Sequence, residues 1–448
     1  MFEALAQNVP ISAVFLAVSF VVFFVLCMKG IHPIVVSLLC SLFIGCVVSG
    51  GPFAAITGPF METFVVYMQS YFLPFAFVGI YAQLMNESGM GESIARYVSG
   101  KANERNFIII LMVLALLLQL SGITVAPLVI APLSFSMLKK YDLPRYIALI
   151  AVVGIDAVVM FMLPGVPNFT NLLPTSYLGT NLFAAPVVGI VTGVYTVVAV
   201  YVFTLIQIKR ARKNGITYDP PAEDGQNAEL YEFTSAELPG FFVSLLPTIV
   251  ILAVCTVLQL AFKVDSTQTT IISLLIGIVL VLLLGSKGFK RSKVTSITEG
   301  AMSVMDALIC VCAICGYGAL IKVTASFAAL EQMILKLDMD PYLLCVVVII
   351  LLSIITASGT SSMVLFYTTF GERALAMGAN PEALHRLSGI ASTSFDSMPQ
   401  NGPTIVTLRA FKMSHKEGYK WIFYVQCLLP LTSILVALVM CYICYPIG

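Results

Sequence analysis

Residues 342–370 read YLLCVVVIILLSIITASGTSSMVLFYTTF, an apolar run that the cluster Ser358-Gly359-Thr360-Ser361-Ser362 interrupts near its middle. A helix that crosses a membrane needs about 20 apolar residues, so this run is too long for one comfortable crossing. Non-helical backbone at membrane depth is tolerated only when it is buried in protein or lines a watery cavity. The run therefore predicts a re-entrant hairpin whose tip lines a solute pathway.

A second hairpin is predicted at 106–138, where Ser121-Gly122-Ile123-Thr124 interrupts another long apolar run. A constant offset of 237 residues superposes the two tips. The further matches fall on Pro, Gly and Glu, which mark the ends and breaks of elements, so they indicate an internal repeat. They pair Pro10 with Pro247, Gly51 with Gly288, Glu62 with Glu299, Gly79 with Gly316, and Pro144 with Pro381.

The composition is that of a polytopic membrane protein. Of 448 residues, 59% are hydrophobic and 10% charged, and the mean hydropathy is +0.97, which excludes a soluble globular enzyme. The net charge is +1 and the basic residues are dispersed, so we expect lipid and no nucleic acid as a partner. Besides the hairpins, hydropathy predicts about ten transmembrane helices, near 10–29, 31–49, 67–85, 145–163, 183–208, 241–262, 269–285, 305–322, 382–398 and 421–445.

The polar segment 209–239 predicts a cytoplasmic linker between a first repeat, 1–208, and a second repeat, 240–448. Five crossings per half is an odd number, so the second half enters the membrane inverted. Alternation then places nineteen of the 24 Lys and Arg residues on the cytoplasmic side, as the positive-inside rule expects. Both termini are expected outside a bacterial inner membrane, with the first hairpin entering from the cytoplasm and the second from outside.

Each half also contains a proline-flanked helix break, at 164–168 and at 399–403. Freed N–H groups and the positive end of a half-helix attract an anion, whereas freed carbonyls suit a cation. Hydroxyl and amide side chains there either add donors for a small organic anion or only permit close helix packing. The expected substrate contacts are Ser121, Gly122, Thr124, Asn168, Thr170, Asn171, Ser358, Gly359, Thr360, Ser361, Ser362, Asn401, Gly402 and Thr404.

Ionisable residues at membrane depth cost about 2.5–3.5 kcal/mol on insertion scales, so each suggests a function. Asp156 and Asp396 lie shortly before the break of their half, where protonation would couple a proton gradient to anion binding. The alternative is a structural cap or a fixed salt bridge, with Arg386 as the partner of Asp396. His385 and Arg386 are candidates for a proton relay and a carboxylate anchor, or are simply end residues of the ninth crossing.

An intramembrane enzyme is a less favoured alternative. The three histidines lie in unrelated contexts, the eleven cysteines are scattered, and the sequence contains no HExxH, GxSxG or Walker A motif. We therefore expect no catalytic residues, no metal and no cofactor. A passive channel is also disfavoured, because paired hairpins suggest a closed midplane site that is reached alternately from the two sides.

The string ASTSFDSMPQNGP at 391–403, preceded by His385-Arg386, resembles the gluconate permease family of the ion transporter superfamily. The resemblance extends through the second hairpin tip and over nearly the whole chain. It implies proton-coupled uptake of small hydroxylated carboxylates, such as gluconate or 3-hydroxybutyrate. It also implies a homodimer with scaffold and transport domains that works as an elevator.

Two departures from the family pattern bear on the substrate. The first break reads LPGVPNFTN at 163–171 without the histidine that many sugar-acid members have, and Gln400 stands where the family often has histidine. The apolar first break favours a short monocarboxylate over a six-carbon sugar acid. Sodium coupling remains the alternative, since hairpin carbonyls and Asn side chains suit Na⁺ as readily as Asp156 or Asp396 suits H⁺.

Overall fold

The computed structural model describes residues 2–29, 31–120, 126–220, 238–285, 289, 291–329, 339–356, 358–398 and 402–447. All regular secondary structure in these ranges is helical, which confirms the predicted all-helical membrane fold. The number of crossings and the re-entrant course of the hairpins stay predictions. Six described helices are long and apolar enough to cross a membrane: Gly51–Glu87, Pro186–Lys213, Phe241–Ala261, Ser266–Leu284, Lys293–Lys322 and His415–Cys444.

In the first half, α7 and α8 flank the predicted hairpin tip, and 121–125 themselves lie outside the described residues. The elements are α1 (Phe2–Ala6), α2 (Val9–Met28), α3 (Pro33–Gly45), α4 (Gly51–Ala55), η1 (Ile56–Phe60), α5 (Met61–Glu87), α6 (Met90–Ser99), α7 (Phe107–Leu120), α8 (Ala126–Lys140), α9 (Tyr146–Ala157), η2 (Val158–Met162), α10 (Phe169–Leu178) and α11 (Pro186–Lys213).

In the second half, α17 and α18 fall in the region of the predicted hairpin and pack on one another. The elements are α12 (Phe241–Thr256), η3 (Val257–Ala261), α13 (Ser266–Leu284), α14 (Lys293–Ser303), α15 (Met305–Lys322), α17 (Pro341–Thr356), α18 (Gly359–Phe366), η4 (Tyr367–Gly371), α19 (Glu372–Ala376), α20 (Pro381–Ser392), α21 (Gly402–Ala410), α22 (His415–Ile422), η5 (Phe423–Leu428) and α23 (Leu429–Cys444).

One predicted crossing, 382–398, is shorter than expected, because α20 ends at Ser392. The following residues form turns, and Phe395 has φ of 62°. A left-handed residue cannot continue a right-handed helix. The chain therefore leaves the helix just before Asp396, which places that carboxylate on a turn.

Polar side chains fix where the interrupted helices begin. Asn168 starts α10 by accepting a hydrogen bond from the Asn171 N–H (2.9 Å), and Asn380 starts α20, with Pro381 next, by accepting from the Glu382 N–H (2.9 Å). Such caps satisfy amino-end N–H groups that have no partner within the helix. The first break is thus encoded by a local side chain as well as by proline.

The helix contacts recur from one half to the other. Helix α2 packs on α3 as α12 packs on α13, α7 packs on α9 as α17 packs on α20, and α9 packs on α11 as α20 packs on α23. Across the halves, α5 packs on α13 as α15 packs on α3. Helix α5 also packs on α15, and α11 on α23, so each of these helices meets its own counterpart. At the second of these contacts Thr196 Oγ1 lies 2.8 Å from Ser433 Oγ, and these residues are 237 positions apart.

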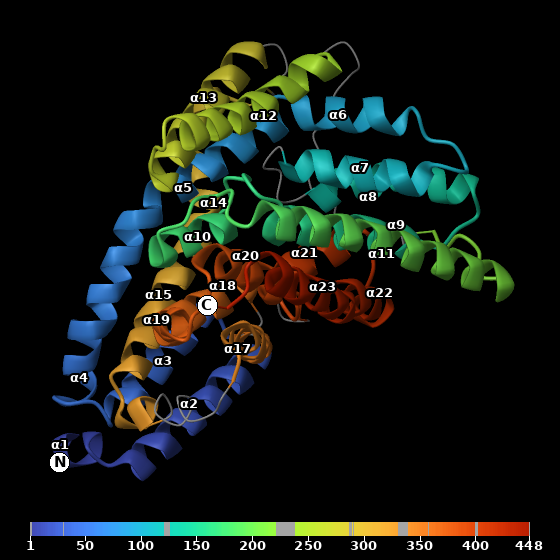
Figure 1. Cartoon of the computed structure of the whole chain (residues 1–448). Helices are drawn as coiled ribbons and strands as arrows, with labels where there is room; N and C mark the ends of the chain where they lie inside the picture. Colours follow the sequence, from blue (N-terminus) through green and yellow to red (C-terminus); the bar gives the residue numbers. More distant parts are fainter. Residues whose placement is uncertain are drawn as a thin grey trace.

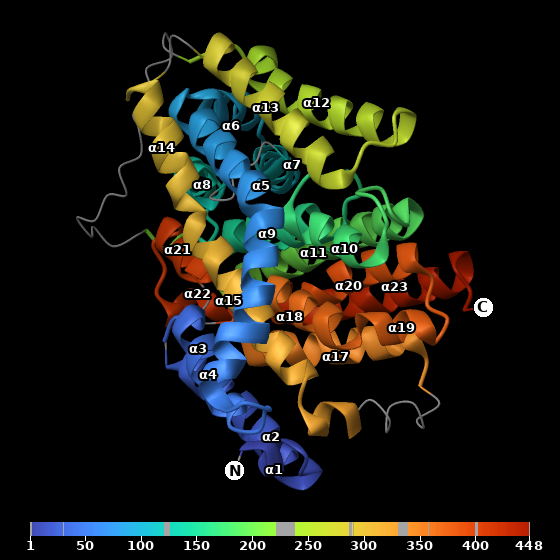
Figure 2. The same ribbon diagram turned by 90° about the vertical axis from the view of Figure 1, so that its left-hand side faces the viewer.

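Figures 1 and 2 show α5 running along one side of the molecule, with α2 and α4 toward one end and α12 and α13 toward the other. The buried apolar side chains form two clusters, and each combines both halves. One joins α3 to α15, α17 and α20, and the other joins α7 and α9 to α12 and α13. Helices α10 and α20 contact one another and both contribute to the first of these clusters.

Candidate functional site

The second hairpin tip is closed against the end of α20. Ser358 caps α18 by accepting from the Ser361 N–H (3.3 Å), and the Gly359 N–H donates to Asp396 Oδ1 at 2.5 Å. A Cβ atom at Gly359 would lie 2.3 Å from the Ser392 carbonyl oxygen, so only glycine fits this contact. The glycine of the tip therefore brings a helix amino end, with its partial positive charge, onto a carboxylate.

The two predicted coupling residues, Asp156 and Asp396, are linked through one glutamine. The Ser397 hydroxyl donates to Gln426 Oε1, and Gln426 Nε2 donates to the Val153 carbonyl (3.0 Å) and to Asp156 Oδ2 (3.4 Å). These bonds fix which end of the Gln426 amide faces each partner. Hydrogen bonds thus connect Asp156 through Gln426 to Ser397. Asp396 precedes Ser397 directly in the sequence. The two carboxylates, one from each half, are close enough for their charges to interact.

Gln426 was missed by the sequence analysis. It lies in η5, a π-helical segment, and its side chain is only 8% exposed. Short π-helical segments interrupt α-helices frequently at functional sites, but they leave no clear sequence pattern. The available signal was a lone amide inside the apolar run 421–445, away from the predicted tips and breaks.

The amides predicted to contact substrate at the first break hold the break itself. Asn168 Nδ2 donates to the Met160 carbonyl (3.0 Å), and Asn171 Nδ2 donates to the Val166 and Leu182 carbonyls (3.0 Å each). The Thr170 hydroxyl donates to the Met160 carbonyl as well. Asn168 and Thr170 satisfy the Met160 carbonyl at the end of η2. The Val166 and Leu182 carbonyls accept backbone N–H groups as well as the Asn171 amide. Their substrate role stays a prediction.

His385 and Arg386 join α20 to the first break. His385 Nε2 lies 3.0 Å from Asn171 Oδ1, and His385 Nδ1 lies 2.7 Å from Thr180 Oγ1. Since Nδ2 of Asn171 donates to two carbonyls, its Oδ1 accepts, so the histidine Nε2 carries the proton. Arg386 is 2% exposed and donates to the carbonyls of Ala184 (3.0 and 3.1 Å), Leu182 (3.1 Å) and Leu163 (3.4 Å). The described contacts of this pair lie apart from the Asp156–Gln426 chain.

A second buried arginine lies in the first half. Arg145 is the residue before α9 and is 5% exposed, whereas Arg386 lies in the middle of α20. It donates to the carbonyls of Phe411 (3.2 Å) and Lys412, which follow α21. It also pairs with the Asp219 carboxylate at 3.2 Å. Each arginine therefore binds the turn after the short interrupted helix of the opposite half.

The remaining predicted contacts fall into three groups. Ser361 and Ser362 are buried in α18, where the Ser362 hydroxyl donates to the Gly359 carbonyl (2.6 Å), and Thr360 is partly exposed. Thr404 is buried in α21, and its hydroxyl has no hydrogen-bond partner among the described residues; the same holds for Ser394, which the sequence analysis did not single out. Gly402 begins α21. Ser121, Gly122, Thr124 and Asn401 lie outside the described residues.

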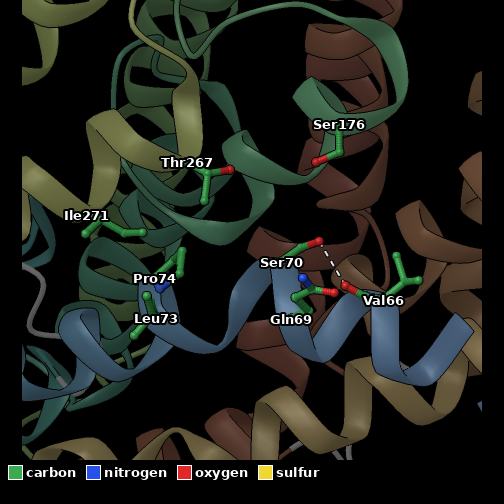
Figure 3. A pocket seen from close by; sticks show the side chains of 8 residues that line it. All are labelled: Val66, Gln69, Ser70, Leu73, Pro74, Ser176, Thr267 and Ile271. Atoms are coloured by element: carbon green, nitrogen blue, oxygen red, sulfur yellow. Dashed lines mark hydrogen bonds between the residues drawn. The ribbon is translucent and has the colours of Figure 1, made fainter.

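A pocket of about 460 Å³ lies elsewhere, between α5, α10 and α13. Figure 3 shows the Ser176 and Thr267 hydroxyls pointing toward one another across it, with Gln69 and Ser70 on α5. No charged side chain and no predicted site residue is among the eight that line it. It therefore offers an anion no cationic partner. Its lining residues are Val66, Gln69, Ser70, Leu73, Pro74, Ser176, Thr267 and Ile271.

Comparison with known proteins identifies a family and several relatives that this chain resembles. A family model described as GntP family permease matches residues 9–397. The chain is 25% identical over 401 residues to the uncharacterized transporter YxjC of Bacillus subtilis (strain 168), covering 81% of this chain and 84% of that protein. It is 24% identical over 353 residues to an uncharacterized transporter of Haemophilus influenzae, covering 77% and 78%.

Solved structures share the fold at low sequence identity. The YdaH transporter of Alcanivorax borkumensis superposes with a TM-score of 0.61 at 12% identity, over 94% of this chain and 99% of that one. MtrF of Neisseria gonorrhoeae, described as illuminating a class of antimetabolite efflux pumps, superposes with a TM-score of 0.54 at 11% identity, over 91% and 94%.

Apolar helices, paired interruptions and transporter relatives together define an integral membrane transporter rather than an enzyme. Since the family model covers most of the chain, the protein belongs to the GntP permease family.

Proposed function

We propose that this permease is a proton-coupled symporter that imports a small organic anion across a bacterial inner membrane, with a short monocarboxylate such as 3-hydroxybutyrate favoured over gluconate. The observation that carries the proposal is the contact of the Asp396 carboxylate with the amino end of α18. The carboxylate can exchange a proton, and the amino end of the helix can bind an anion. A proton-coupled symporter links these two processes, and here they share one contact.

The anion site is proposed at the second hairpin tip and the second break. The amino end of α18 supplies partial positive charge, and the tip hydroxyls supply donors. The buried hydroxyls of Ser394 and Thr404, without partners among the described residues, support a polar ligand there, because buried polar groups otherwise find partners. The corresponding residues of the first half are proposed to complete the site.

The proton site is proposed at Asp156 and Asp396. A charged carboxylate inside a membrane protein is costly, and two that interact repel one another. A proton that neutralises one of them removes this repulsion while the substrate brings its own negative charge. The combined transfer of one proton and one monocarboxylate is electrically neutral.

The proposed movement follows the two-repeat organisation, 1–208 and 240–448 joined by 209–239. Inverted repeats with interrupted helices are typical of alternating-access transporters. The recurrence of helix contacts in the two halves supports this division. Elevator motion, external termini and a homodimer are parts of the proposal drawn from the family resemblance.

The test uses the purified chain in proteoliposomes that hold an internal pH dye. Gluconate, 3-hydroxybutyrate, lactate and citrate are added in turn without sodium, beside empty liposomes. Acidification by one acid above the empty-liposome signal supports proton symport and identifies the substrate class. No acidification with folded protein, but uptake of a labelled acid that requires sodium, overturns proton coupling in favour of sodium coupling.

A further inference from the structure

The Asp396 carboxylate contacts the amino end of α18 but is not the N-cap of this helix. Helix α18 already has an N-cap, since Ser358 accepts from the Ser361 N–H, and the Ser362 N–H donates to the Ser358 carbonyl (3.0 Å). The Asp396 carboxylate comes from 37 residues along the chain. A carboxylate held at 2.5 Å by the backbone N–H of a helix amino end has the geometry with which proteins bind anions.

We propose that Asp396 occupies the position of the substrate carboxylate at the amino end of α18, so that the two carboxylates compete for the Gly359 N–H. This inference rests on the proposed function and states how the proton and the anion are coupled. While Asp396 is ionised, it holds the N–H and repels a second carboxylate. Once a proton neutralises Asp396, its oxygen becomes a weaker acceptor and the substrate carboxylate replaces it.

The surroundings of Asp396 suit such an exchange. The residue lies on the turn after α20, where Phe395 adopts φ of 62°, and not within a helix. Its neighbour Ser397 is bonded to Gln426, so a change at Asp396 reaches Asp156 through one side chain. The titratable groups whose charge would interact with that of Asp396 include Asp156 of α9 and Cys427 of η5.

The proposal predicts the sign of the pH dependence of binding. Because binding needs a protonated Asp396, affinity is greatest at low pH and falls as pH rises through the titration of this group. Above that point the dissociation constant rises about tenfold per pH unit, since one proton is taken up with each anion. An asparagine at this position carries no charge to compete, so its affinity should be high and independent of pH.

The experiment measures binding of 3-hydroxybutyrate and gluconate to the purified full chain by calorimetry across about three pH units, so that a tenfold change per unit is resolved. The variants are Asp396→Asn, Asp156→Asn and the control Asp306→Asn, whose side chain is 73% exposed and pairs with His32. We expect a flat profile for Asp396→Asn alone. A retained slope in Asp396→Asn, or loss of binding in that variant while its thermal unfolding matches wild type, overturns the competition.

A second measurement on the wild-type chain keeps the test valid if Asp396→Asn does not fold. Binding heats in buffers of different ionisation enthalpy give the number of protons taken up with each anion. Uptake near one proton at high pH supports the exchange, and binding without proton uptake overturns it. If the wild-type chain binds neither acid at any pH, the proposed substrate class fails, which is distinct from failure of the competition.

Discussion

The two halves hold their interrupted helices with one buried arginine each, but they balance its charge differently. Arg145 binds two carbonyls and the half-exposed Asp219 carboxylate, which lies on the segment following α11. The described partners of Arg386 are carbonyls only, on Leu163, Leu182 and Ala184. Carbonyl dipoles inside a protein are not screened by salt, whereas an ion pair near solvent is.

This difference indicates which break is held more firmly. Arg386 binds the turn after α10 through carbonyl contacts that are buried. Arg145 binds the turn after α21 and also forms an ion pair that water and salt reach. We therefore expect added salt to weaken the attachment at the second break more than that at the first.

The largest effect is expected from Arg386→Met. The Ala184 and Leu163 carbonyls would lose their guanidinium donors, and each buried carbonyl left without a donor costs about 1–3 kcal/mol. The Leu182 carbonyl would keep the Gly165 N–H and the Asn171 amide. The free energy of unfolding should therefore fall by at least about 3 kcal/mol, measured by thermal unfolding in detergent. Arg409→Met, at an exposed position of α21, is the matched control. Equal unfolding temperatures for the two variants would show that the carbonyl contacts contribute little.

A smaller loss is expected from Arg145→Met. Two carbonyls lose their donor, but water can reach the half-exposed Asp219 and solvate it. The free energy of unfolding should fall by about 2 kcal/mol, less than for Arg386→Met in the same assay. The comparison of the two halves breaks down if Arg145→Met proves the more damaging variant.

Asp219→Asn should change stability by no more than about 1 kcal/mol, because half-exposed ion pairs are weak. The effect should shrink as salt is added, since salt screens the wild-type pair. Unfolding at low and high salt, with the Arg145→Met and double variants completing a cycle, isolates the pair. If the free energies of unfolding of Asp219→Asn and wild type differ by the same amount at low and high salt, the Arg145–Asp219 pair is not the salt-screened contact described above.

The smallest effect is expected from replacing the residue with positive φ in each of the two turns by glycine. Ala185 has φ of 41° and Lys412 has φ of 50°, in the region that favours glycine. Ala185→Gly and Lys412→Gly should each raise the free energy of unfolding by about 0.5–1 kcal/mol. Glycine removes the steric cost of the left-handed conformation, but it also adds conformational entropy to the unfolded chain, which offsets part of the gain. Unfolding midpoints measured side by side test this. A gain in one turn and a loss in the other would mean that the turns are not equivalent.

Much of the fold could be predicted from the sequence, because the lengths of apolar runs and the positions of Pro and Gly determine helices and their ends. Asp156 and Asp396 were each predicted from their place before a break, but they are 240 positions apart rather than 237, so the repeat offset does not pair them. Gln426 and the partners of Arg145 could not be predicted. Their roles depend on contacts across more than 260 residues of sequence, and no local pattern encodes such contacts.

Arg386 was singled out from the sequence, but its partners were not predicted. An arginine at membrane depth predicts an anion partner, and the sequence analysis considered Asp396 or the substrate for this role. In the structure its described partners are backbone carbonyls, which every residue supplies and which no sequence pattern marks. The Gly359–Asp396 contact was likewise hidden, although both residues were singled out separately.

The contact between Thr196 and Ser433 has a consequence for how the two predicted repeats are related in space. In a symmetric dimer, a residue on the two-fold axis touches its own copy in the other subunit. Here the same kind of contact joins residues 237 positions apart within one polypeptide. The contact therefore marks where a two-fold axis relating the two predicted repeats would pass. Because the two positions belong to one polypeptide, a substitution at one is not repeated at the other, so the pair can consist of threonine and serine and still form a hydroxyl–hydroxyl hydrogen bond.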